Sequence, residues 1–233
     1  MIAHDQTLQY ELVRSRRATA DIVVERDGSI VVRAPRHLSD TCIARMVDSR
    51  RLWIHKALAE WRDSNAARIV REYRNGEGFP YLGRSHRLLI VSDQEEPVLL
   101  KNGRLCLRRD LAEDTDNSAA RAALRNFYIE RGRVRLRERV DYFAPKVDVI
   151  PAGFIVKELG HRWASCSAKG SLSFHWKCLM APPSVIDYII VHELCHLRHL
   201  DHSEAFWNEV DKVLPDYEEK RAWLRRNGAS LDL

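Results

Sequence analysis

Hydrophobic and polar residues alternate along the first part of the chain in the way that half-buried β-strands require. The alternating segments are residues 7–15, 20–26 and 29–34. Asp27-Gly28, between the last two, is a preferred two-residue hairpin turn. After Ser39-Asp40, which can cap a helix, apolar residues recur every three or four positions from Ile43 to Trp61. The pattern predicts a small antiparallel sheet covered by one helix that ends between residues 62 and 75.

A second group of short strand-like segments follows two glycines, Gly76 and Gly78. These segments are residues 79–83, 86–92, 97–101 and 104–108. Asn102-Gly103 joins the last two as another tight turn, so we expect a second antiparallel patch. A polar linker, residues 113–118, then precedes an arginine-rich helix bounded by Pro145. Its predicted inward-facing residues are Leu124, Phe127, Val134 and Val140.

The last part of the chain combines two strand-like segments with three helices. Residues 154–159 and 172–176 are strand-like and flank a loop over residues 160–170. Pro182-Pro183 offers a preorganised first turn for an apolar helix, and two amphipathic helices follow, separated by Pro215. The whole pattern predicts an α+β fold with two domains. Residues 1–144 form an N-terminal α+β region with two β patches and two long helices, and residues 145–233 form a C-terminal domain.

The composition indicates the cellular compartment and shows that charge is unevenly distributed along the chain. Five widely spaced cysteines among 233 residues, without a Cys-x-x-Cys pair, favour a reducing cytoplasm over a disulfide framework. We expect neither an export signal nor a membrane span, because no apolar run approaches 18 residues. Residues 1–144 hold 27 basic and 21 acidic side chains, whereas residues 145–233 hold 11 and 12. The basic excess, with seven arginines between Arg121 and Arg139, can meet nucleic acid or an acidic partner, or form a solvated helix face.

The candidate metal-binding and catalytic residues lie between Val185 and His202, where four of the ten histidines occur. His192, Glu193 and His196 form the pattern His-Glu-x-x-His. Residues four positions apart on a helix share one face and lie about 6 Å apart along the axis, so both imidazoles can reach one ion. Zinc binds neutral imidazoles at about 2.0–2.1 Å, and a glutamate beside the first histidine can take a proton from water.

A catalytic zinc ion usually has three protein ligands, so a third one is expected downstream. The candidates are His199, His202, Glu204, Glu209, Glu218 and Glu219. On a continuous helix His199 would lie about 7.5 Å beyond the midpoint of the first two histidines, a long reach for one imidazole. If the helix ends near His199 and the chain folds back, His202 can approach from a third direction, and Asp201 or Ser203 can cap a new helix. We therefore expect His202, with a downstream glutamate as the rival.

Four stretches together resemble a known family. They read RWASCS at 162–167, LMAPP at 179–183, IDYIIVHELCH at 186–196 and DHSEAFW at 201–207. The chain resembles the YgjP-like metallopeptidase-domain family and, more distantly, the SprT-like zinc proteases, most closely over about residues 154–224. The resemblance implies a zincin-like catalytic domain in which His192, His196 and His202 bind zinc and Glu193 is the catalytic glutamate.

The sequence therefore favours a zinc metallopeptidase that acts on peptides or proteins. Two alternatives remain open at this point: a metal-dependent nucleotide pyrophosphohydrolase using the same site, and a non-enzymatic nucleic-acid-binding module with a structural zinc. In zincins an edge strand beside the metal helix pairs with extended substrate. Residues 171–176 are the natural candidate for that strand, with residues 154–158 as their partner. Cys166 and Cys195 are expected to pack rather than to bind metal.

Overall fold

The computed structural model describes residues 8–16, 19–24, 29–65, 71–160 and 162–233. The Asp27-Gly28 turn and His161 lie outside the described residues. The chain divides into two compact units, Met1–Arg68 and Ile69–Leu233. The domain boundary that we predicted between residues 144 and 145 does not coincide with this division, because it falls inside a long helix whose two ends belong to one hydrophobic core.

Unit 1 contains a three-stranded mixed sheet. Its strands are β1 (Glu11–Ser15), β2 (Asp21–Val24) and β3 (Ile30–Pro35), in the order β1-β3-β2. β2 pairs with β3 antiparallel, as a hairpin requires, but β1 pairs with β3 parallel. The expectation of an antiparallel sheet was therefore wrong for β1. Alternation shows which side chains share a face but not the direction of a strand. Because β3 lies between β1 and β2, β1 pairs with β3, and these two strands run in the same direction.

Two helices, not one, cover this sheet. α1 spans Asp40–Ser49 and α2 spans Arg51–Asn65, with the interruption at Arg50. Ser39 caps α1 by accepting the backbone N–H of Cys42 on its hydroxyl, as the sequence predicts. Apolar residues of both helices pack with those of β3 in one core. The fully buried members of this core are Val32, Ala34, Ile43 and Ile54.

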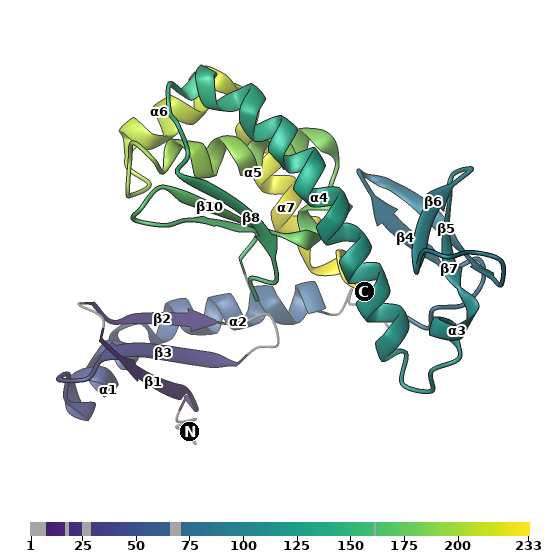
Figure 1. The fold of residues 1–233 in the computed structure, drawn as a ribbon. Coiled ribbons are helices and arrows are strands. Elements are labelled where there is room, and N and C mark those ends of the chain that lie inside the picture. The colour runs from purple at the N-terminus through teal and green to yellow at the C-terminus, as the bar shows by residue number, and fades with distance from the viewer. Residues whose placement is uncertain (1–7, 17–18, 25–28, 66–70, 161) are drawn as a thin grey trace. The chain divides into compact units, whose positions relative to one another are not determined.

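Unit 2 is arranged around α4 (Ser118–Val147), which Figure 1 shows with the second sheet on one side and the third sheet and the C-terminal helices on the other. Apolar residues of α4 contribute to one core over most of its length. The fully buried ones are Ala120, Leu124, Tyr128, Leu136 and Val147. Val134, which we expected to face inward, is 63% exposed, and Pro145 lies within the last turn instead of bounding the helix.

The second sheet has the order β4-β5-β7-β6. Its strands are β4 (Gly78–Tyr81), β5 (Arg84–Val91), β6 (Val98–Lys101) and β7 (Arg104–Arg108), followed by the short helix α3 (Arg109–Ala112). Asn102 and Gly103 join β6 to β7, both with positive φ, which confirms the predicted turn. β5 and β7 pair parallel, so this patch is also mixed and not purely antiparallel.

The third sheet supports the candidate site, and its strand order corrects a prediction. Its strands are β8 (Gly153–Lys157), β9 (Ala164–Cys166) and β10 (Ser171–His175), in the order β8-β10-β9. β10 is paired on both sides, so residues 171–176 do not form the edge strand that we expected. That edge is β9, which folds back onto β10 through a turn closed by Gly170 N–H donating to the Ser167 carbonyl. Because β9 has only three residues, the alternation of apolar and polar positions is too short to predict it as a strand.

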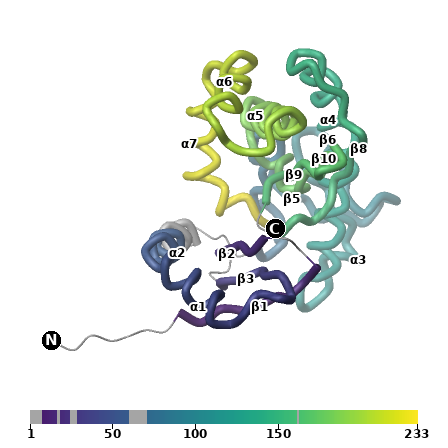
Figure 2. Tube along the Cα trace, turned by 90° about the vertical axis from the view of Figure 1, so that its left-hand side faces the viewer, coloured from purple at the N-terminus to yellow at the C-terminus, as the bar shows by residue number. Residues whose placement is uncertain are grey.

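The remaining elements follow in chain order. They are the 3₁₀ helix η1 (Trp176–Met180), α5 (Pro183–Cys195), α6 (Glu204–Val213), α7 (Tyr217–Asn227) and the 3₁₀ turn η2 (Gly228–Ser230). Pro183 occupies the first turn of α5, as the sequence predicts. In Figures 1 and 2, α5 lies beside α4, and α6 and α7 lie close to it. Among the described residues, no helix has the combination of length and hydrophobicity that a membrane span needs.

Candidate metal centre

Helix α5 carries the His-Glu-x-x-His pattern on an element that is buried along most of its length. Val185, Ile189 and Ile190 are 0–4% exposed and pack into the core. Its second turn is tied to α4 by two hydrogen bonds, because Arg139 Nε and Nη2 each donate to one oxygen of Asp187 at 2.7 Å. His192 lies in the last turn and His196 is the C-cap residue. The fold therefore fixes the backbone from which two imidazoles project toward the same place.

The chain reverses direction directly after α5, as the third-ligand argument requires. We call residues 197–203 the α5–α6 connector. His196 Nδ1 donates to the carbonyl of His199 at 3.0 Å, which leaves Nε2 of His196 available for a metal. Asp201 then accepts the backbone N–H of Ser203, the N-cap residue of α6. The reversal brings His202 back until its Nε2 lies 3.1 Å from Nε2 of His192.

The three imidazoles form a set of donors that fits a zinc ion. Ligand atoms of His192, His196 and His202 all lie within 4.8 Å of one another. Two nitrogens bound to one tetrahedral zinc ion lie about 3.3 Å apart, so small side-chain rotations suffice. The rival glutamate Glu209 instead pairs with Arg198 and Lys212. Imidazole ligands also favour zinc over Mg²⁺ or Ca²⁺, which prefer oxygen ligands.

Burial and neighbouring basic groups favour the neutral, ligand-competent forms of His192 and His202. Burial, together with the neighbouring His196, His202 and Arg221, lowers the pKa of His192 to about 3. The pKa of His202 is also below its usual value, because of burial, His196 and Arg221, with Asp201 opposing. Metal binding requires deprotonated ligands, so at neutral pH these two imidazoles need not lose a proton first.

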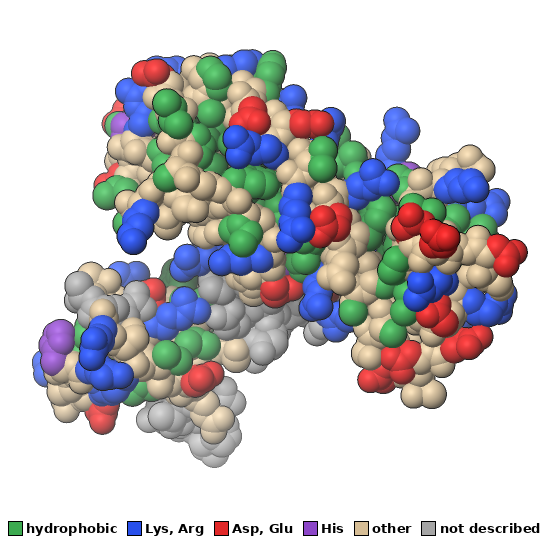
Figure 3. All heavy atoms as spheres, viewed as in Figure 1, with side chains coloured by type: hydrophobic (Ala, Val, Ile, Leu, Met, Phe, Trp, Pro, Cys, Tyr) green, Lys and Arg blue, Asp and Glu red, His purple; other side chains and the backbone are tan. Residues whose placement is uncertain are grey.

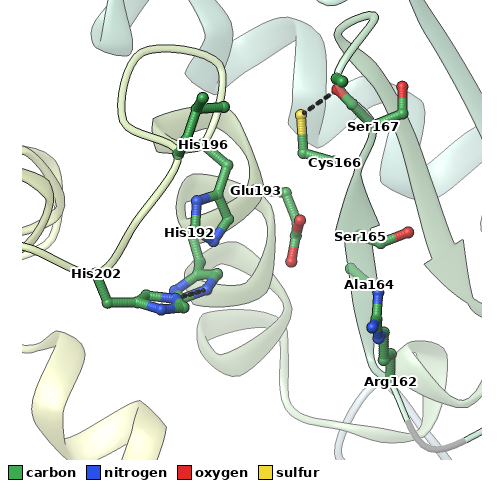
Figure 4. A pocket seen from close by; sticks show the side chains of 11 residues that line it. Arg162, Ala164, Ser165, Cys166, Ser167, His192, Glu193, His196 and His202 are labelled. Carbon is green, nitrogen blue, oxygen red and sulfur yellow. Dashed lines mark hydrogen bonds between the residues drawn. The ribbon is translucent and has the colours of Figure 1, made fainter. Parts of the chain in front are cut away.

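Glu193 lies in the same cleft, with its carboxylate between the histidines and β9 (Figure 4). Glu193 is only 6% exposed. Burial raises the pKa of Glu193 to about 7, although Arg162 and the backbone N–H of Cys166 act in the opposite direction. A carboxyl group with a pKa near the working pH is well suited to accept and return a proton.

The cleft itself has a volume of about 370 Å³ and separates α5 from β9. Besides the four predicted site residues, its lining comprises Arg162, Ala164, Ser165, Cys166, Ser167, Ala168 and Leu200. Periodicity singles out neither Arg162 nor Leu200, although Arg162 begins one of the stretches that carry the family resemblance. Cys195 is fully buried, as expected, and burial raises the pKa of the half-buried Cys166, so its thiol stays protonated at neutral pH.

Three imidazoles and a buried carboxyl group in one cleft define a metallohydrolase-type centre. The family model for the YgjP-like metallopeptidase domain matches residues 18–227, so the chain belongs to the YgjP-like metallopeptidase family. It is accordingly a metal-dependent hydrolase of the metallopeptidase class. A solved structure, the metallopeptidase zymogen of Pyrococcus abyssi abylysin, is 22% identical over 42% of this chain and 99% of that chain, with a TM-score of 0.38. No curated protein matches the sequence.

Proposed function

We propose that the protein is a zinc peptidase in which His192, His196 and His202 hold the ion and Glu193 transfers the proton. The observation that carries this proposal is the convergence of three imidazole ligand atoms within 4.8 Å beside Glu193 in one cleft. When bound, zinc polarises the scissile carbonyl and lowers the pKa of water toward neutrality.

Glu193 performs the proton transfers in this mechanism. Its carboxylate takes a proton from the attacking water as the new C–O bond forms. The same carboxyl group then returns that proton to the leaving amine nitrogen as the C–N bond breaks, so no net proton remains on the enzyme. The burial that brings the pKa of Glu193 to about 7 allows both steps near neutral pH.

The edge of β9 is the surface best placed to hold an extended peptide. β9 pairs only with β10 among the described residues, and its other edge borders the cleft. Ala164, Ser165 and Cys166 have small side chains, which allows another backbone to approach. Main-chain pairing to such an edge recognises the peptide backbone and tolerates many side chains. Leu200, 89% exposed at the rim, would then offer an apolar contact to a substrate side chain.

The charge pattern supports a peptide substrate more than a nucleotide or nucleic acid. Among the described residues that line the cleft, Arg162 is the only Lys or Arg, so this lining offers no basic cradle for a phosphoanhydride. Four arginines of the arginine-rich helix α4 pair with acidic residues. These are Arg133 with Glu130, Arg135 with Glu138, Arg137 with Asp141 and Arg139 with Asp187. On the face of unit 2 seen in Figure 3, basic and acidic side chains are interspersed, and no single basic field is visible.

The test is metal analysis combined with a substrate screen. We expect about one zinc per wild-type chain, and most of it should be lost in His202→Ala. His199→Ala is the matched control and should keep its zinc, because His199 contributes its backbone carbonyl to the site. The zinc-loaded protein should hydrolyse members of a peptide library and no member of a nucleotide library. Zinc retained in His202→Ala but lost in Glu209→Ala would refute the ligand assignment, and hydrolysis of nucleotides alone would refute the peptidase.

A further inference from the structure

His202 differs from the other two histidines in the way its ring is held. His192 and His196 project from α5, and His196 is also fixed by its hydrogen bond to the His199 carbonyl. His202 lies in the α5–α6 connector and is itself an exposed residue. Among the described residues, the only hydrogen-bond-range contact of its ring is with Nε2 of His192. Something other than a hydrogen-bonded partner must therefore orient this imidazole.

The ring of His202 stacks on the indole of Trp207. Their centroids are 5.6 Å apart and their planes differ by 23°. Trp207 in turn stacks on Tyr217 of α7, at 5.2 Å and 16°. The guanidinium of Arg221 lies 4.9 Å from the centroid of the same indole. Trp207 is thus held by α7 and presents a flat surface against which the imidazole lies.

From this arrangement we propose that Trp207 is the positioning residue for the third metal ligand. The inference rests on the proposed function and extends it to a residue that does not touch the metal. A histidine on an exposed connector loses side-chain freedom when it binds an ion. A rigid aromatic partner removes much of that freedom before the ion binds. Stacked rings also stabilise each other in addition to the stabilisation from the apolar area that they bury.

The position of Trp207 in the chain makes this coupling direct. His202 precedes α6 by two residues, and Trp207 lies in the first turns of that helix. Phe206, its fully buried neighbour, contacts all three histidines at centroid distances of 4.6–4.9 Å and anchors this part of α6 in the core. Phe206 therefore anchors this part of α6 and meets the His202 ring edge-on, whereas Trp207 stacks on His202 and has a tilted contact with His192 at 5.8 Å.

The experiment measures zinc affinity of the full-length chain by competition with a chromogenic chelator. Trp207→Leu should weaken zinc binding by at least ~10-fold, the lower end of the loss expected when a group that orients a metal-binding histidine is removed. Trp207→Phe keeps a flat ring and should stay within about 3-fold of the wild type. Trp223→Leu is the matched control, because Trp223 is a partly buried tryptophan of α7 without a ring contact to the histidines among the described residues. It should bind zinc as the wild type does.

A double substitution separates positioning from a general structural role. If Trp207 acts through His202, then Trp207→Leu should cost nothing further in a His202→Ala background, and its cobalt(II) absorption spectrum should move toward that of His202→Ala. Losses that add in the double variant, or wild-type zinc affinity in Trp207→Leu, would overturn the inference. A wild-type chain that binds no zinc would overturn the proposed function, and this inference with it. Thermal unfolding of each metal-free variant checks that the fold is intact.

Discussion

Helix α5 and the connector that follows it contribute to one centre by different physical means. In α5 the positions of two imidazoles follow from helix geometry, and the helix is fixed by buried residues such as Ile190. In the connector, Leu200 is 89% exposed, and the position of His202 depends on a chain reversal and on packing against α6. A short motif therefore specifies part of a site, whereas tertiary structure completes it.

The largest expected difference between the two regions is in stability. Ile190 is fully buried in α5, so Ile190→Ala should lower the free energy of unfolding by about 2–5 kcal/mol, since it removes apolar contacts and leaves a cavity. Leu200→Ala, in the connector, should change it by no more than about 0.5 kcal/mol. Urea unfolding of both variants measures this. Equal losses would show that the connector is packed as tightly as the helix.

The next effect concerns catalysis. Glu193→Gln keeps the shape of the side chain but cannot accept the proton, so turnover should fall by at least ~10²-fold. Zinc content should be unchanged, because the three imidazoles remain. Peptide hydrolysis and metal analysis on the same preparations provide the measurement.

Glu204→Gln is the control for that experiment, because Glu204 is an exposed residue at the start of α6 and lies outside the cleft lining. It should retain full activity. Full activity in Glu193→Gln would mean that another group takes the proton.

The same contrast explains what could be predicted from the sequence. The spacing of His192 and His196 and the apolar run before them were sufficient to predict α5. The prediction of His202 depended also on where the helix ends. In the structure, Nε2 of His202 lies 3.1 Å from Nε2 of His192. In both cases the controlling interactions are local in sequence or follow from a short chain reversal.

Strand pairing depended on contacts that are distant in sequence. The parallel pairs β1–β3 and β5–β7 arise because each joins two strands that are not consecutive in the chain, and β10 is central because it pairs with both β8 and β9; alternation does not encode this strand order. The predicted domain boundary failed for a related reason. α4 packs against both the second sheet and α5, so residues on either side of position 144 share one core.

A third prediction concerns the link between α5 and α4. Arg139 and Asp187 are 28% and 18% exposed and form two hydrogen bonds of 2.7 Å. Arg139→Ala leaves Asp187 without these donors, so it should lower the free energy of unfolding by about 1–2 kcal/mol. Arg133→Ala, which removes an exposed i,i+3 pair with Glu130, should have less than half of that effect. Thermal unfolding of the two variants compares them, and equal shifts would contradict the assigned role of Arg139.

The smallest effect should arise from Arg198, which anchors the connector. Its Nη1 donates to the carbonyl of Val147 at the end of α4, and it lies 3.5 Å from the Glu209 carboxylate. Arg198→Ala should cost less than about 1 kcal/mol, because Arg198 is 44% exposed and Glu209 keeps its contact with Lys212. The loss should instead appear locally, as faster backbone hydrogen exchange across residues 197–203 with residues 185–195 unchanged.

Arg225→Ala is the matched control for this last experiment, because it removes an exposed arginine from the final turn of α7. It should leave exchange in both segments as in the wild type. If Arg198→Ala accelerated exchange equally in α5 and in the connector, the two regions would open as one unit. The third ligand would then be held by the same cooperative packing as the first two. Faster exchange in the connector alone would show that His202 belongs to a separately opening segment, whose order depends on the contacts made by Arg198 and by the ring of His202 itself.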